Sequence, residues 1–295
     1  MKTPSSSVRK ALLLIVLQSL VYGFGNPISK MAYDHVAVYS LLTVRYGIAV
    51  LALAALFGRQ TLRELRAGGL RLRDWLPACL CIAASYLLSN TAMQYTSVTA
   101  MAFLASLSVV ITPLLTLVVS RRRPHRSEPF ILVLAAAGLY LLCGYGGLTE
   151  FGWGDVLVLL SAVMMALALL LSERGMAAVS PGTLTLLQAV TSALLALVCA
   201  LVFDGGVFLS GADGRDWLII VYLGVTCTAG GYLLQNAATR CSSARTVALI
   251  QCTYPLATAV FSLLMLDERL TLVGWIGAAL ILLSTIACTL TADEK

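Results

Sequence analysis

Tyrosine and side-chain amide groups recur at helical spacing inside apolar stretches of this sequence. Tyr86, Asn90 and Gln94 are four residues apart, so on a helix they share one face, and Tyr22 and Asn26 repeat that spacing near the N-terminus. Amide and hydroxyl groups bind polar solutes by hydrogen bonds, and they are costly to bury in hydrocarbon without a partner. These faces are therefore predicted to line a polar cavity rather than to contact lipid.

Arg45 is the one charged residue predicted to lie deep within an apolar segment. A guanidinium group in that position can bind a carboxylate or phosphate of a ligand. It can also reach outward to the interface or bond backbone carbonyl groups between helices. Acidic residues fall at the ends of the predicted segments or in loops, which disfavours a mechanism based on protonation of a buried carboxylate.

Eleven polar residues are predicted to bind a ligand or to gate its passage. Serine and threonine at the same spacing have an alternative role, because they can bond their own preceding carbonyl groups and help helices to pack. The tyrosines can likewise be packing residues with a bonded hydroxyl group. The candidates are Gln18, Tyr22, Asn26, Arg45, Tyr86, Asn90, Ser108, Tyr232, Asn236, Gln251 and Tyr254.

The elements that must hold these residues are membrane-spanning helices. The chain has 295 residues, of which 59% are hydrophobic and 12% are charged, about half the charged fraction of a soluble domain. Apolar runs predict ten crossings: 10–31, 36–57, 75–95, 98–119, 129–148, 153–172, 181–203, 217–238, 244–266 and 271–291. The first run is interpreted as a retained helix rather than a signal peptide because it is too long. The fold class is thus all-α and integral to the membrane.

The arrangement of the basic residues predicts the orientation of these crossings. With the N-terminus in the cytoplasm, alternation of sides places 16 basic residues inside and 3 outside. This split follows the positive-inside rule, so both termini are expected in the cytoplasm, with no nucleic-acid partner needed to explain the net charge of +6. Eight cysteines lie almost entirely in apolar stretches and are interpreted as small apolar residues. No metal site, cofactor or catalytic residue is predicted.

The sequence contains an internal repeat at an offset of 146 residues. Residues 81–92 align without gaps to residues 227–238 with seven identities in twelve, including a Tyr and an Asn four apart. Five crossings per repeat is an odd number, so the second copy must enter the membrane from the opposite side. We expect two inverted five-helix repeats, residues 1–149 and 150–295. Inverted repeats are typical of secondary transporters, with the substrate site near the midplane.

These features resemble the drug/metabolite transporter superfamily, in its EamA-type ten-helix branch. The resemblance covers about residues 10–291. It rests on the Arg45-Tyr46 pair, the Tyr and Asn spacing in helices three and eight, the Tyr254-Pro255 pair and the stretch from Leu266 to Thr271. It implies a basket of helices around a central cavity, lined mainly by helices one, three, four, six, eight and nine, that works by alternating access.

The resulting hypothesis is a secondary transporter of a small polar organic metabolite, with an amino-acid-like compound as first guess, in a bacterial cytoplasmic membrane. Its partners would be a small-molecule substrate and the lipid bilayer, and the protein would be a monomer or a homodimer. Two alternatives stay open. One is a flippase for a lipid or lipid-linked carrier, which a lateral opening between helices would indicate. The other is an integral-membrane transferase, although His35, His125, Asp267 and Glu268 form no evident catalytic cluster.

Overall fold

The computed structural model describes residues 6–33, 36–67, 71–96, 98–120, 128–141, 152–207, 209, 212–266 and 271–291, and these contain helices and no strands. The helices of the first half are α1 (Ser6–Tyr33), α2 (Val38–Arg66), α3 (Leu72–Ala92), α4 (Val98–Ser106), α5 (Ser108–Ser120) and α6 (Glu128–Leu139). Those of the second half are α7 (Trp153–Gly175), α8 (Pro181–Cys199), α9 (Gly214–Tyr222), α10 (Gly231–Cys241), α11 (Ala244–Ile250), α12 (Thr253–Leu266) and α13 (Leu272–Thr291). Two π-helical segments, η2 (Ala200–Asp204) and η3 (Leu223–Gly230), follow α8 and α9.

Seven helical stretches are long and apolar enough to cross a membrane. Three further apolar helices, at Leu104–Thr116, Pro129–Gly138 and Leu272–Ser284, are shorter. Large apolar side chains point outward from the bundle: Leu51 is 72% exposed and Leu218 is 74% exposed. A surface of this kind is stable against hydrocarbon and not against water. The protein is therefore a multi-pass membrane protein.

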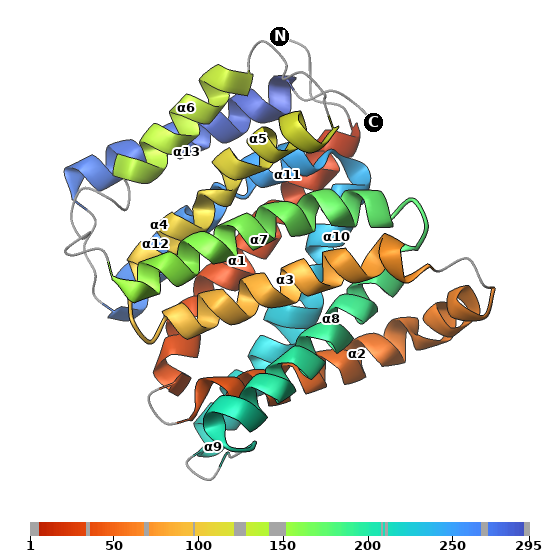
Figure 1. Ribbon diagram of the computed structural model, residues 1–295. Coiled ribbons are helices and arrows are strands. Elements are labelled where there is room, and N and C mark those ends of the chain that lie inside the picture. The colour runs from red at the N-terminus through yellow and green to blue at the C-terminus, as the bar shows by residue number, and fades with distance from the viewer. Residues whose placement is uncertain are drawn as a thin grey trace.

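The helices pack in pairs that match across the two halves of the chain. The α2 helix packs on α8, and α6 packs on α13 (Figure 1), so each of these contacts joins elements at corresponding places in the two halves. The α3 helix packs on α7, and the corresponding pair is α10 on α1. The α12 helix packs on α1, and α4 and α5 pack on α7. The two halves thus share these contacts between corresponding helices.

The α1 helix crosses the centre of this arrangement as one continuous helix. The helix continues through the stretch from Gly23 to Pro27, and Pro27 lies inside α1. Close packing holds the helix there: a Cβ atom added to Gly23 would lie 2.7 Å from the backbone carbon of Ala257 in α12. The Ser29 hydroxyl donates to the carbonyl oxygen of Gly25 at 2.7 Å, which satisfies a backbone group next to the proline.

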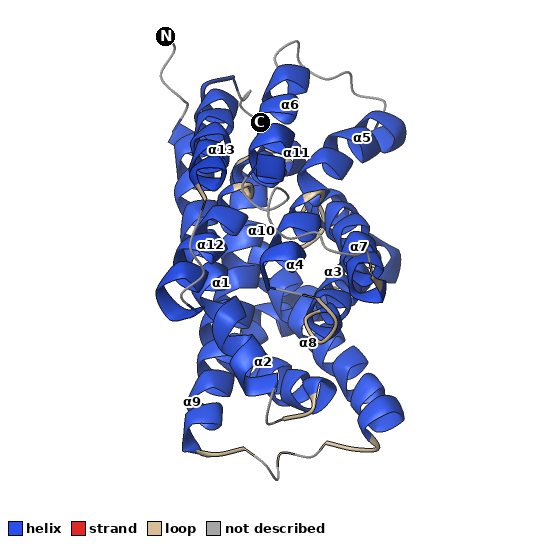
Figure 2. Ribbon diagram, turned by 90° about the vertical axis from the view of Figure 1, so that its left-hand side faces the viewer, coloured by secondary structure: helices blue, strands red, loops and turns tan. Residues whose placement is uncertain are grey.

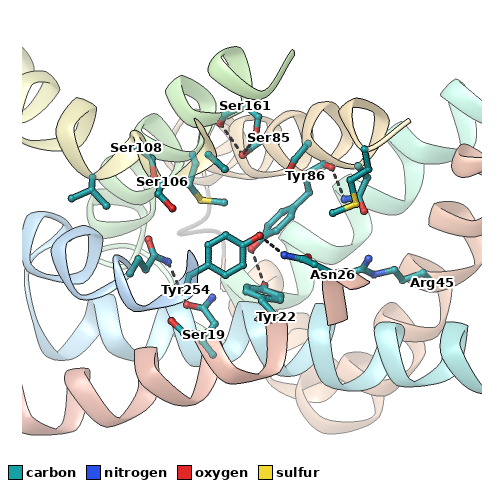
Figure 3. A pocket seen from close by; sticks show the side chains of 18 residues that line it. Ser19, Tyr22, Asn26, Arg45, Ser85, Tyr86, Ser106, Ser108, Ser161 and Tyr254 are labelled. Atoms are coloured by element: carbon teal, nitrogen blue, oxygen red, sulfur yellow. Dashed lines mark hydrogen bonds between the residues drawn. The ribbon is translucent and has the colours of Figure 1, made fainter. Parts of the chain in front are cut away.

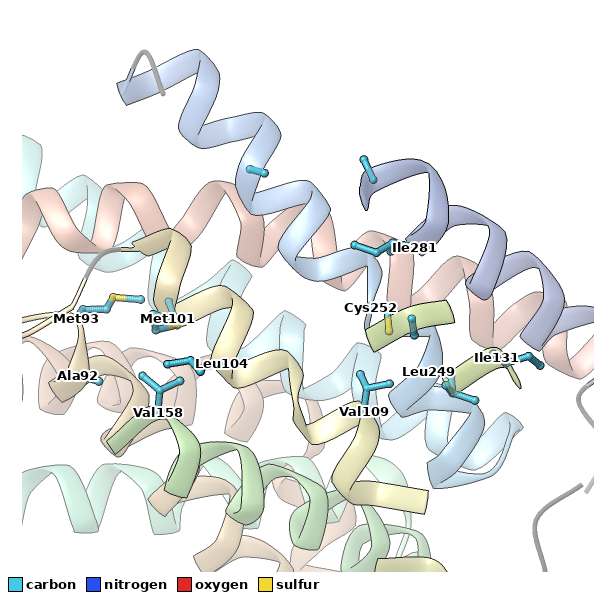
Figure 4. Close-up of a cluster of buried hydrophobic side chains, with 13 residues drawn as sticks. Ala92, Met93, Met101, Leu104, Val109, Ile131, Val158, Leu249, Cys252 and Ile281 are labelled. Atoms are coloured by element: carbon cyan, nitrogen blue, oxygen red, sulfur yellow. The ribbon is translucent and has the colours of Figure 1, made fainter. Parts of the chain in front are cut away.

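The largest apolar cluster lies to one side of the centre, between the α4–α5 region, α6, α7 and the α11–α13 region (Figure 4). It includes Met101, Val109, Leu249 and Ile281, all of them buried. Smaller apolar clusters join α2, α3 and α8 on the opposite side of the bundle, where Figure 2 shows α2 and α8 far from α6 and α13. The polar candidates lie between these two packed regions.

Candidate substrate cavity

A cavity lined by polar and apolar side chains lies among α1, α2, α3, the α4–α5 break, α7 and the α11–α12 break (Figure 3). The space within it that the centres of water molecules can occupy is about 90 Å³. Because one water needs about 15 Å³ of such space, the cavity holds roughly six waters, or a solute of roughly 180 Å³. The lining residues are Gln18, Ser19, Tyr22, Asn26, Arg45, Ser85, Tyr86, Ser89, Asn90, Met93, Ala105, Ser106, Ser108, Val109, Ser161, Met165, Gln251 and Tyr254.

Nine of the eleven predicted residues line this cavity, and two do not. The nine are Gln18, Tyr22, Asn26, Arg45, Tyr86, Asn90, Ser108, Gln251 and Tyr254. The structure places Tyr232 and Asn236 outside it, on the side of α10 that packs against α8. The Tyr232 hydroxyl group bonds Ser192 at 3.1 Å, and Asn236 donates to Thr185 at 2.9 Å and to Gln188 at 2.6 Å. These two side chains thus lie in helix contacts and not in the cavity lining, although the Tyr232 ring packs on that of Tyr86, with the centroids 5.2 Å apart.

Three tyrosines and an asparagine form the centre of the cavity wall. The Tyr86 hydroxyl donates to the Tyr22 hydroxyl at 2.8 Å, with the ring centroids 5.9 Å apart. The Tyr254 ring meets the Tyr22 ring edge to face at 6.4 Å, and its hydroxyl accepts a hydrogen bond from Asn26. The four side chains come from α1, α3 and α12, so they connect both halves of the chain across the cavity (Figure 3).

An amide cluster closes the cavity on another side. Gln18 donates to the side-chain oxygen of Gln235 at 3.0 Å and to the carbonyl oxygen of Gly231 at 3.0 Å. The Gln251 amide donates to Gln235 at 3.2 Å and to Gln18 at 3.3 Å. Gln235 was not among the predicted site residues, although it is adjacent to Asn236. Each amide has one donor group and one acceptor group, so the cluster can exchange partners with a polar ligand.

Two broken helices expose polar groups to the cavity. The break between α4 and α5 falls at Leu107, where Ser106 and Ser108 flank it. The break between α11 and α12 leaves Gln251 and Cys252 outside either helix, with Tyr254 in the first turn of α12. The two breaks lie at corresponding places in the halves. Unwound backbone inside a membrane is tolerated where it lines a cavity, and broken helices of this kind form the substrate sites of many transporters.

Arg45 lies at one end of the cavity and is only 6% exposed. Its Nε group donates to the Thr228 hydroxyl at 2.8 Å, and its guanidinium carbon lies 6.0 Å from the centre of the Tyr46 ring. Thr228 belongs to the π-helical segment η3. The guanidinium is therefore buried and does not extend to the membrane surface. It bonds a side-chain hydroxyl group and faces the cavity (Figure 3).

Sequence reasoning missed a second stripe on α3. Ser85, Ser89 and Met93 are four residues apart and line the cavity beside Tyr86 and Asn90. Their spacing is visible in the sequence, but serine and methionine give weaker signals than tyrosine and asparagine. Gln94, expected on the polar face, lies beyond the end of α3 and is exposed. Ser161 and Met165 of α7 complete the wall, and the Ser85 hydroxyl donates to the Ser161 carbonyl at 2.9 Å.

Within the described ranges, no three His, Cys, Asp or Glu side chains are grouped as a metal site would require. His35, His125, Asp267 and Glu268 lie outside those ranges. The cavity is consequently a site built from hydroxyl and amide groups with a single guanidinium. Its chemistry suits the binding of a polar solute.

A multi-pass helical bundle around a cavity with polar side chains is typical of membrane transporters. The EamA-like transporter family model matches residues 9–144 and again residues 152–290. The chain belongs to this family. The two matches succeed each other along the chain, one in each half.

Relatives and a solved structure agree with this assignment. An uncharacterized transporter of Archaeoglobus fulgidus is 26% identical over 279 residues, which cover 94% of this chain and 84% of the relative. An uncharacterized transporter in the cobO 3'region of a Sinorhizobium species is 30% identical over 125 residues, covering 42% of this chain and 86% of that relative. One crystal structure superposes with a TM-score of 0.78 over 98% of this chain and 100% of the other; at 18% identity this likeness shows the fold. These relationships indicate transport rather than catalysis.

Proposed function

We propose that this protein is a secondary transporter that moves a small polar organic metabolite across the cytoplasmic membrane of a bacterium by alternating access. The convergence of nine predicted polar residues on one cavity carries the proposal. In hydrocarbon, polar groups without a ligand or water to bind are costly, so a cavity of this composition implies a polar occupant. Amino-acid-like compounds are the first candidates, because the cavity is of their size and offers hydrogen bonds on several sides.

The proposed architecture has ten crossings in two inverted repeats, residues 1–149 and 150–295, with both termini in the cytoplasm. The matched contacts of α2 with α8 and of α6 with α13 support it, as does the start of α1 and the end of α13 lying at the same end of the bundle (Figure 1). Alternating access would then be a rocking of the halves about the cavity, with the Tyr22, Tyr86 and Tyr254 contacts among those that open and close.

Uptake into proteoliposomes tests the function. The purified full-length chain is reconstituted, and exchange of labelled solutes from a panel of amino acids, purines, hydroxy acids and quaternary amines is compared with that in protein-free vesicles. We expect at least one polar solute to exchange faster with the protein present. Asn90→Ala should reduce that exchange, because Asn90 lines the cavity and holds the Tyr33 hydroxyl at 2.6 Å.

Arg240→Gln is the matched control, because Arg240 is exposed and lies outside the cavity, where it donates to the Met176 carbonyl at 2.9 Å. It should leave exchange unchanged. The proposal fails if no solute in the panel exchanges above the protein-free rate while Asn90→Ala has no measurable effect on ligand binding.

A further inference from the structure

Among the described residues, no Asp or Glu side chain lines the cavity beside Arg45. Of the 18 residues that line the cavity, Arg45 is the one that carries a charge. Its nearest ionisable neighbours are Tyr46, Cys227, Tyr33 and Tyr22, all of which are neutral at pH 7. An ion pair between Arg73 and Asp74 lies elsewhere in the structure. The cavity thus contains one buried positive charge.

The hydrogen bonds of Arg45 hold the guanidinium in place without neutralising it. Nε donates to Thr228 at 2.8 Å on the η3 side, and the Tyr33 hydroxyl is a second neighbour. That hydroxyl in turn donates to Asn90 at 2.6 Å, and the Asn90 amide donates to the Tyr86 carbonyl at 2.7 Å. The guanidinium is therefore fixed by neutral groups, and its end lies toward Asn26 in the cavity (Figure 3).

Charge balance then limits what can occupy the cavity. A buried charge is unfavourable in a medium of low dielectric constant unless an opposite charge lies beside it. One carboxylate would neutralise one guanidinium and match its parallel donors. A zwitterion would leave the total at one positive charge and would bury an ammonium group with no carboxylate to bind it, and a cation would add to the repulsion.

We propose that the cavity selects solutes with a single carboxylate and no ammonium group, so that the loaded site is neutral. The inference rests on the proposed transport function and names the substrate class of the same site. The carboxylate would lie against Arg45 near Asn26 and Asn90. The hydroxyl or amide groups of the solute would bind Ser106 and Ser108 at the opposite end, with the tyrosines between (Figure 3). Small hydroxy acids fit this description better than amino acids.

Binding of three solutes with one skeleton tests the selection. Glycerate, serine and serinol are of similar size and carry charges of minus one, zero and plus one at neutral pH. Their dissociation constants for the full-length protein in detergent are obtained from the dependence of the melting temperature on ligand concentration. We expect glycerate to bind between about tenfold and a hundredfold more tightly than serine, as the range for hydrogen bonds to charged groups implies. Serinol should bind most weakly.

Substitution of Arg45 shows whether this residue sets the preference. In Arg45→Gln the ratio of the serine to the glycerate dissociation constant should fall to near one, whereas Arg45→Lys should keep a reduced preference for glycerate. Arg240→Gln removes the same charge outside the cavity and should leave the ratio unchanged. If Arg45→Gln does not fold, Thr228→Val tests the same contact, because it removes the hydroxyl group that Nε of Arg45 bonds. This variant should lower the ratio of the two dissociation constants and keep part of the preference for glycerate.

The inference is overturned if serine or serinol binds as tightly as glycerate, if no acid in a panel of monocarboxylates binds, or if Arg45→Gln keeps the full preference. It is also overturned if glycerol 3-phosphate binds more tightly than glycerate, because a dianion would leave the site negatively charged. Failure of the proposed function is distinguishable, since then no solute of any charge would exchange across proteoliposome membranes. Exchange of amino acids without acid selectivity would leave the function standing and remove the inference alone.

Discussion

The two halves of this protein use the same residues for different purposes. Tyr86 and Asn90 in α3 correspond, at an offset of 146 residues, to Tyr232 and Asn236 in α10. The first pair lines the cavity. The second pair is 1% exposed at each residue and bonds Ser192, Thr185 and Gln188 of α8. A repeated motif in the sequence thus gives one binding face and one packing face.

The π-helical segment η3 accounts for the difference. The residues that correspond to η3, 77–84, lie inside the regular helix α3. A π-helix has more residues per turn than an α-helix, so the same number of residues turns through a smaller angle. Residues after η3 are therefore rotated about the helix axis relative to those at the same place in α3, although the Tyr232 ring still packs on that of Tyr86. Gln235 takes up the contacts with Gln18 and Gln251 on the side that Asn236 would otherwise occupy.

Truncation of the two tyrosines should separate their roles most strongly. Tyr232 is among the largest fully buried side chains, so Tyr232→Ala should destabilise the protein by about 3–5 kcal/mol. Tyr86 faces the cavity, so Tyr86→Ala should cost roughly half as much stability and should mainly weaken ligand binding. Unfolding in mixed detergent measures the first effect, and ligand-dependent melting measures the second. Equal stability losses would contradict the assignment of separate roles.

The asparagines should show the same division with a smaller effect. Asn236→Ala removes hydrogen bonds to Thr185 and Gln188 inside the α8–α10 contact, and should cost about 1–2 kcal/mol of stability. Asn90→Ala should change stability less and should weaken ligand binding, because the Tyr33 hydroxyl loses its partner next to Arg45. The same two assays apply. If Asn236→Ala weakened binding more than Asn90→Ala, the second half would be part of the site after all.

The sequence predicts the helices and most of the cavity, because both follow from the periodicity of side chains. Apolar runs locate helices within each expected segment, and steps of four residues identify the cavity faces of α1 and α3. The predicted faces fail after η3, since nothing in residues 223–230 marks a π-helical segment before the backbone is known. The periodicity of side chains thus predicts where the helices lie, but it does not predict how η3 rotates the residues that follow it.

The helix breaks show a second limit of sequence reasoning. Proline does not mark the first break, which lies at Leu107, six residues before Pro113. The Ser106 hydroxyl donates to the Ala102 carbonyl at 2.7 Å just before this break, a contact that bends helices. In the second half Pro255 lies in the first turn of α12, where its missing N–H group is tolerated. Hydrogen bonds of side chains to the backbone, and packing, therefore position these helix breaks together with proline.

The smallest expected effect tests the hydroxyl pairs of the two halves. Tyr22 and Tyr86 share a hydrogen bond of 2.8 Å in the cavity, and Ser192 and Tyr232 share one of 3.1 Å in the α8–α10 contact. Double-mutant cycles, Tyr22→Phe with Tyr86→Phe and Ser192→Ala with Tyr232→Phe, should each give a coupling of about 0.6 kcal/mol in unfolding experiments.

A bound ligand should change only one of these couplings. The hydroxyl groups of Tyr22 and Tyr86 line the cavity, so a polar solute can offer them new partners, and the coupling between them should decrease when ligand saturates the protein. Ser192 and Tyr232 are not among the residues that line the cavity, so a solute offers their hydroxyl groups no new partner and their coupling should be kept. A ligand that altered both couplings equally would mean that the two halves respond as one unit, and that the difference between their surroundings does not separate binding from packing.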